Sequence, residues 1–129
     1  MLARFDEDTY LHQVCARGED GILRQATDLP EALSQRSAWH ELQPWRVHFH
    51  VPVFRAELAG GLVTTRSALD HALATVARGA LTPHIEIETY TWGVLPPGTG
   101  GADLVEDLAR EYEYVLGTLA DHGVHPEAS

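Results

Sequence analysis

Residues 45–53 read Trp-Arg-Val-His-Phe-His-Val-Pro-Val and form the clearest strand pattern in the chain. The alternation places apolar residues on one face of a strand and polar residues on the other. The apolar face holds Val47, Phe49 and Val51, and the polar face holds Arg46, His48 and His50. We expect the apolar face to lie under helices. Because parallel sheets are normally covered on both faces, two imidazoles on the other face require a separate explanation.

Residues 83–90 repeat this pattern. Ile85 and Ile87 fall on one face, whereas Glu86 and Glu88 fall on the other. If the two strands are parallel neighbours, imidazoles and carboxylates meet on one face of the sheet. His50 and Glu88 then lie nearer the carboxyl ends of the strands, where α/β folds place their sites.

Helices are expected after both strands. Thr65 can cap a helix that extends to residue 78, and a longer amphipathic helix begins near Ala102. The expected apolar side of the longer helix comprises Leu104, Val105, Leu108, Tyr112, Val115, Leu116 and Leu119. The acidic residues Asp103, Glu106, Asp107, Glu111 and Glu113 are assigned to its solvated side.

The first third of the chain adds a further unit. Residues 9–15 predict a short strand, Gly18 to Gly21 a turn, and Asp28 the cap of a short helix that extends to about Arg36. Alternating strands and helices indicate a parallel α/β sheet. Since a full eight-stranded barrel needs about 200–250 residues, we expect a partial TIM-barrel-like sheet of about three βα units with helices on one face. Residues 1–129 would form a single domain with a flexible tail at 124–129.

Charge and length restrict the function. The chain has 129 residues and a formal net charge of −10, which disfavours nucleic acid or an anionic membrane as the main partner. No apolar stretch approaches the roughly 18 residues of a membrane span, and the first residues do not resemble a signal peptide. We therefore expect a cytoplasmic protein that acts on a small molecule. The lone Cys15 fits a reducing compartment.

The polar faces of the two strands predict a metal site. Imidazole and carboxylate together suit Zn, Mn, Fe or Co, and a carboxylate can also carry a proton. The expected metal ligands are His50, Glu88, His48 and, from the first strand, His12; the expected proton carriers are Glu88 and Glu86. Two alternatives remain open. The polar face can be merely solvated, or His48 and His50 with the downstream Glu57 can belong to a cupin.

Three phrases of the sequence, at residues 10–14, 45–54 and 84–92, together resemble a known family. They are similar to the carboxyl-terminal part of the TIM-barrel metabolite traffic proteins of the bacterial ebo cluster. These are relatives of the xylose-isomerase-like sugar phosphate isomerase/epimerase superfamily. The resemblance covers the chain from about Phe5 to Tyr114.

The resemblance implies a divalent-metal site at the carboxyl ends of barrel strands and sugar isomerisation by proton transfer. The final-strand glutamate of the superfamily best matches Glu88, and the histidine of the preceding strand best matches His50. The Asp-x-x-His motif of the superfamily is absent from this chain, so the ligand set is incomplete.

We therefore expect a sugar phosphate isomerase/epimerase-like protein linked to metabolite processing or traffic. A non-catalytic carrier or scaffold in metabolite export is one alternative. A metal-dependent phosphodiesterase of the endonuclease IV type is another. An unpaired sheet edge would also favour a homodimer.

Overall fold

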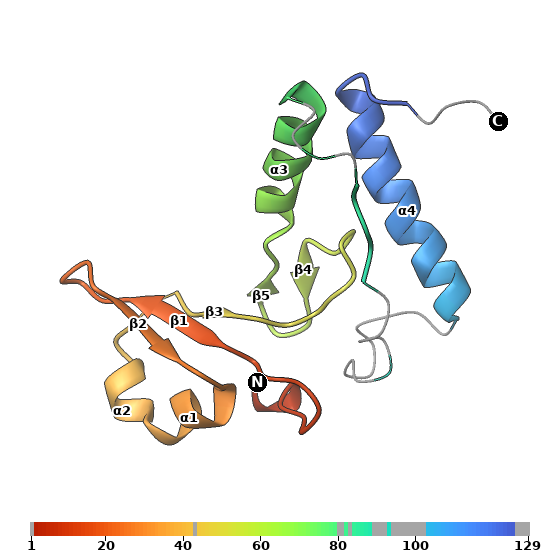
Figure 1. The fold of residues 1–129 in the computed structure, drawn as a ribbon. Coiled ribbons are helices and arrows are strands. Elements are labelled where there is room, and N and C mark those ends of the chain that lie inside the picture. The colour runs from red at the N-terminus through yellow and green to blue at the C-terminus, as the bar shows by residue number, and fades with distance from the viewer. Residues whose placement is uncertain are drawn as a thin grey trace. The chain divides into compact units, whose positions relative to one another are not determined.

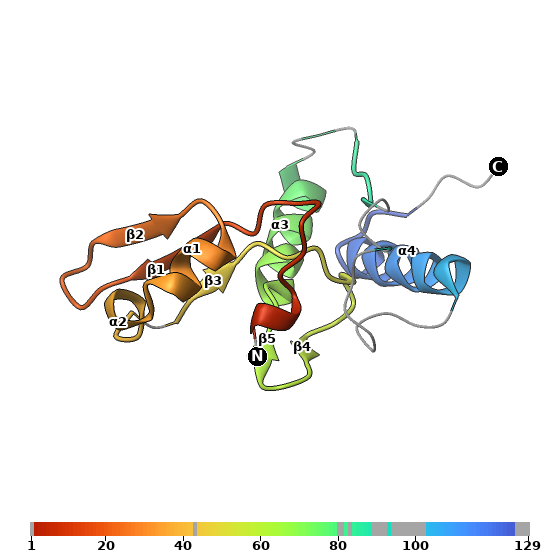
Figure 2. The same ribbon diagram turned by 90° about the horizontal axis from the view of Figure 1, so that it is seen from below.

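The computed structural model describes residues 2–42, 44–79, 82, 84–88, 93 and 103–125. The chain divides into two compact units, Met1–His50 and Val51–Ser129. Figures 1 and 2 show the elements of both units in two views.

The first unit is built on an antiparallel sheet of three strands in the order β2-β1-β3. The strands are β1 (Val14–Arg17), β2 (Leu23–Ala26) and β3 (Arg46–Val47). A tight turn joins β1 to β2: the Gly18 N–H donates to Ile22 O at 3.0 Å, and Gly21 has a φ of 77°. Glycine adopts this left-handed conformation without steric cost.

Short helices complete the first unit: η1 (Leu2–Arg4), α1 (Leu29–Ser34) and α2 (Arg36–Trp39). As predicted, Asp28 is the N-cap of α1, and a proline occupies its first turn. The core of the unit comprises Val14, Ala16, Ala26, Leu29, Ala32, Trp39 and Leu42, and the partly buried Val47 and Phe49 pack against it.

The second unit contains a two-stranded hairpin and two long helices. The hairpin pairs β4 (Glu57–Leu58) with β5 (Leu62–Val63), and Gly60 and Gly61 in its turn have positive φ angles. The helices are α3 (Arg66–Gly79) and α4 (Leu104–Asp121). Leu73 of α3 forms a core cluster with Val115 and Leu119 of α4.

The predicted parallel sheet of βα units is wrong. All strand pairs among the described residues are antiparallel. The physical reason lies in the turns at Gly18–Gly21 and Gly60–Gly61. Connections this short can only reverse the chain into an antiparallel neighbour, because a parallel pair needs a crossover of a dozen or more residues.

The two polar-faced strands are also shorter than predicted or absent. In the stretch 45–53, only Arg46 and Val47 belong to the sheet. Pro52 has no N–H with which to continue a ladder. Residues 84–88 form no strand. The remainder of the predicted 83–90 strand and residues 126–129 of the predicted tail lie outside the described residues.

The two long helices are confirmed, but the predicted buried face of α4 is confirmed only at Val115 and Leu119. Leu104, Val105, Tyr112 and Leu116 are exposed. The buried residues of α4 are Asp107, Glu111, Val115 and Leu119. This face is rotated by about 60° around the helix axis from the predicted one, at 3.6 residues per turn. Two acidic residues assigned to solvent therefore lie inside.

Candidate functional site

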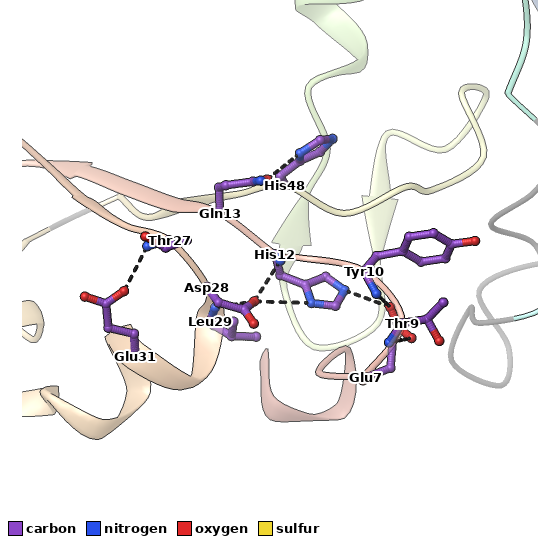
Figure 3. A network of polar contacts seen from close by, with 10 residues as sticks. All are labelled: Glu7, Thr9, Tyr10, His12, Gln13, Thr27, Asp28, Leu29, Glu31 and His48. Atoms are coloured by element: carbon purple, nitrogen blue, oxygen red, sulfur yellow. Dashed lines mark hydrogen bonds and ion pairs between the residues drawn. The ribbon is translucent and has the colours of Figure 1, made fainter.

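His48 and His50 lie next to each other in the first unit, immediately after β3. Their ring centroids are 4.9 Å apart. The backbone N–H of His48 donates to Gln13 O at 2.9 Å, which extends the β1–β3 pairing by one residue. This register brings Gln13 and His48 to the same side of the sheet, as Figure 3 shows.

Gln13 orients the His48 ring. Nδ1 of His48 lies 2.8 Å from Oε1 of Gln13. Since an amide oxygen only accepts hydrogen bonds, Nδ1 is the donor in this contact, and in the neutral ring the lone pair then lies on Nε2. Histidine ligands of metals are commonly held in this way, with one ring nitrogen donating to a carbonyl while the other binds the ion.

His50 is half-buried, and its ring centroid lies 6.5 Å from that of Tyr10. The pair formed by His48 and His50 therefore borders on residues of the segment that leads into β1. This part of the candidate site comes from two segments far apart in the sequence that the antiparallel register brings together.

His12 faces the opposite side of the sheet from His48. It is only 7% exposed, and its ring lies 5.2 Å from that of Phe49 on the core side. Figure 3 shows His12 between two carboxylates. Its Nε2 lies 3.7 Å from Glu7 Oε1, and its Nδ1 lies 3.7 Å from Asp28 Oδ1. The strand alternation that gathers His48 and Gln13 thus separates His12 from them.

The two carboxylates beside His12 also bind backbone groups. Asp28 Oδ1 accepts hydrogen bonds from the N–H groups of His12, at 2.8 Å, and Leu29, at 2.9 Å. Glu7 accepts from the N–H groups of Thr9 and Tyr10. Desolvation raises the pKa of Glu7, but these hydrogen bonds and the nearby His12 outweigh it and hold the pKa below its ordinary value. This network connects the segment between η1 and β1 with the start of α1.

The predicted carboxylates Glu86 and Glu88 belong to the second unit, where both side chains are exposed. The predicted metal ligands are therefore divided between the two units. Within the described ranges, no group of three or more His, Cys, Asp or Glu side chains forms a metal-ion cluster. Metal binding by His12, His48, His50 and Glu88, and proton transfer by Glu86 or Glu88, stay predictions.

The second unit contains a polar cluster that the sequence analysis missed. Asp107 and Glu111 of α4 are 2% and 3% exposed. Oε1 of Glu111 accepts a hydrogen bond from Val53 N–H at 3.0 Å, whereas Oε2 is buried and has no hydrogen-bond partner among the described residues. The missed signal is the spacing of residues 107, 111, 115 and 119, which recur every four residues and share one helix face.

Burial and charge alter the titration of Glu111. Burial raises the pKa of its carboxyl group, the hydrogen bond from Val53 lowers it, and the negative charge of Asp107 raises it. The sum places the pKa of Glu111 above its ordinary value. Asp107 in turn has a cation nearby, since its Oδ1 lies 3.8 Å from Nη1 of Arg110.

Comparison of the chain with protein-family models, with curated proteins and with solved structures found no match. Among the described residues, no helix has the length and apolar character needed to cross a membrane.

Proposed function

We propose that the chain binds a divalent transition metal through His48 and His50. This metal would serve the handling of a small metabolite by chemistry of the sugar phosphate isomerase or epimerase type. The observation that supports the proposal is the oriented imidazole pair: two rings 4.9 Å apart, with Gln13 on Nδ1 of His48. Neutral imidazole is a suitable ligand of Zn, Cu, Fe and Ni.

The fit to a metal is partial. Two imidazoles fill two of the four positions of a tetrahedral ion, so we expect weak binding that leaves positions for a substrate. A bound divalent ion would supply Lewis acidity to a hydroxyl–carbonyl pair of the substrate. The residues of this chain would position the two imidazoles through the β1–β3 pairing, and Gln13 would fix the tautomer of His48.

Calorimetric titration with Zn and Mn tests the proposal. The wild-type chain should bind with a dissociation constant above about 1 µM, which corresponds to a binding free energy of about −8 kcal/mol or weaker. His48→Ala and His50→Ala should each abolish the signal, and Gln13→Leu should weaken it about tenfold, within the range seen for outer-shell partners of metal ligands.

His71→Ala is the matched control, since His71 is exposed on α3 and its Nδ1 contacts a backbone oxygen, Ser67 O, at 2.9 Å. Equal loss in His71→Ala would show that the metal binds histidine without regard to the pair. Metal binding without turnover of sugar phosphates would favour a carrier over an isomerase. Submicromolar affinity that disappears in Glu88→Gln would show a more complete ligand set than the pair.

A further inference from the structure

The edge strand β2 of the first unit leaves a row of backbone groups open. Among the described residues β2 pairs only with β1, which separates it from β3, as Figure 2 shows. In an antiparallel ladder, residues alternate between those that bond to the neighbouring strand and those whose N–H and C=O groups point away from it. The Gly18 N–H donates to Ile22 O at 3.0 Å. By this alternation Arg24 also bonds to β1, whereas Leu23 and Gln25 turn their N–H and C=O groups to the open edge.

The pairing on the other side of β1 gives the same alternation. The His48 N–H donates to Gln13 O at 2.9 Å, so Gln13 and every second residue after it turn their backbone groups to β3. Ala16, the partner of Arg24, belongs to the other set and bonds to β2. Two hydrogen bonds on opposite sides of β1 therefore agree on which groups of β2 are open.

The open edge of β2 also exposes apolar side chains. Ile22 and Leu23 are 60% and 47% exposed. Proteins usually protect such an edge with a proline, a bulge or a charged side chain. Residues 23–26 contain no proline, and they pair with β1 in an unbroken register. Their one charged residue, Arg24, is neutralised by Asp20, whose Oδ2 lies 2.7 Å from Nη2 of Arg24. The edge therefore lacks the features that keep another strand away.

The charge of the β1–β2 hairpin suits a contact between two copies of the chain. The whole chain has a net charge of −10, so two copies repel each other wherever their acidic residues meet. Residues 14–26 contain two arginines, Arg17 and Arg24, and two acidic residues, Glu19 and Asp20. Because this hairpin is neutral, two hairpins can approach each other without that repulsion.

We propose that β2 pairs with β2 of a second copy of the chain, in an antiparallel register with a two-fold axis at Arg24. In this register Leu23 of each copy exchanges both backbone hydrogen bonds with Gln25 of the other, so all the open groups are used. Ile22 of one copy lies opposite Ala26 of the other, and Ala26 belongs to the apolar core. One edge therefore complements itself, as a two-fold dimer requires.

The axis places the two Arg24 residues opposite each other. Like charges in this position destabilise a sheet, but each Arg24 donates to both oxygens of its own Asp20, at 3.0 Å and 2.7 Å. The hydrogen bond from Arg24 lowers the pKa of Asp20 to about 2, so the ion pair is present at neutral pH. Asp20→Asn removes this charge but keeps an acceptor for the Ile22 N–H. It should weaken association at least about threefold.

Analytical ultracentrifugation of the full chain tests the dimer. The wild type should pass from monomer to dimer between about 5 µM and 500 µM, around a dissociation constant of about 50 µM. EDTA removes metal, and a reductant prevents Cys15 from crosslinking two copies.

Gln25 offers a matched pair of variants, because its backbone and not its side chain makes the contact. Gln25→Pro removes an open N–H at an edge position where proline is tolerated, and should weaken association at least about tenfold. Gln25→Ala keeps the N–H and should associate like the wild type. Urea unfolding checks that Gln25→Pro folds; if it does not, Asp20→Asn decides the matter.

Amide hydrogen exchange locates the contact. The N–H groups of Leu23 and Gln25 should exchange more slowly as the protein concentration rises. The Thr27 N–H donates to Glu31 Oε2 at 2.9 Å within one chain, so its exchange should not depend on concentration.

Several results would overturn the proposal. These are a monomer throughout the concentration range, a folded Gln25→Pro that dimerises like the wild type, or wild-type association in Asp20→Asn. Loss of the dimer in Leu116→Glu but not in Gln25→Pro would place the contact on the exposed side of α4 instead. Because the experiment excludes metal, its failure leaves the proposal for His48 and His50 intact. Failure of the metal titration likewise leaves this one intact.

Discussion

The two units of this chain differ in whether acidic side chains are buried. In the first unit, the core is apolar except for His12, and polar residues such as Arg46 and His48 are exposed. In the second unit, α4 turns two carboxyl groups inward while Val105 and Leu116 face outward. Residues 46–49 therefore keep the alternation of faces that their sequence predicts, whereas α4 keeps only part of its predicted face.

The difference has a geometric cause. On a strand, successive side chains point to opposite faces, so a residue has only two choices and the apolar set decides between them. On α4, a rotation of about 60° around the helix axis replaces some residues of the buried face by others. Val115 and Leu119 are buried in both orientations. The hydrogen bond from Val53 N–H to Glu111 favours the orientation that the structure has.

The largest expected effect tests the strand alternation of the first unit. Phe49 stacks on Phe5 with ring centroids 4.6 Å apart and packs against the core. Phe49→Ala should lower the free energy of unfolding by about 3 kcal/mol, whereas His48→Ala, at an exposed neighbour, should change it by less than about 0.5 kcal/mol. Urea unfolding followed by fluorescence of Trp39 and Trp45 in a Trp92→Phe background measures both. Equal midpoints would contradict the assigned faces.

The next effect tests the rotated face of α4. Leu119 is 9% exposed and Leu116 is 44% exposed, although both are leucines one turn apart. Leu119→Ala should cost about 2–3 kcal/mol and Leu116→Ala less than about 1 kcal/mol, as measured by urea unfolding with circular dichroism at the helix band. The reverse order would restore the apolar side predicted from the sequence.

The sequence predicted local features well and pairing poorly. Asp28 as a cap, the extent of α3 and the existence of α4 follow from short-range signals within one turn of helix. The direction of strand pairing depended on whether Gly18–Gly21 and Gly60–Gly61 close hairpins, and the spacing of later helices suggested crossovers instead. For the candidate site, His48 and His50 were predicted as a pair from their alternation. Neither Gln13 nor Glu111 was found, because their roles depend on contacts 35 and 58 residues away.

A smaller effect compares the two N-caps. Asp28 binds the N–H of Leu29 and also that of His12, 16 residues away, whereas Asp103 binds only N–H groups of its own helix, those of Val105 and Glu106. Asp28→Ala should therefore cost about 2 kcal/mol and Asp103→Ala about 1 kcal/mol. Thermal unfolding of both variants measures the difference. A cost for Asp103→Ala that equals or exceeds that of Asp28→Ala would mean that the link to His12 adds no stability.

The smallest effect concerns the titration of Glu111. Its pKa in the folded chain is raised by burial and by Asp107, so the folded state holds this proton more tightly than the unfolded state does. The stability that protonated Glu111 contributes is then fully present below its ordinary pKa of about 4.3. It is lost as the pH rises through the raised value in the folded chain. Glu111→Gln, which never ionises, should lose none of it.

Urea midpoints measured between about pH 4 and pH 8, the range above the ordinary glutamate pKa, should therefore show Glu111→Gln gaining on the wild type as the pH rises. Glu113→Gln, the same substitution at an exposed position two residues away, should parallel the wild type throughout. A constant difference between Glu111→Gln and the wild type over this range would mean that the carboxyl group titrates alike in the folded and unfolded chains. Burial of the Glu111 carboxyl group in α4 would then add no electrostatic cost to the free energy of folding. The two units would differ in which side chains they bury, but not in the energy of a buried charge.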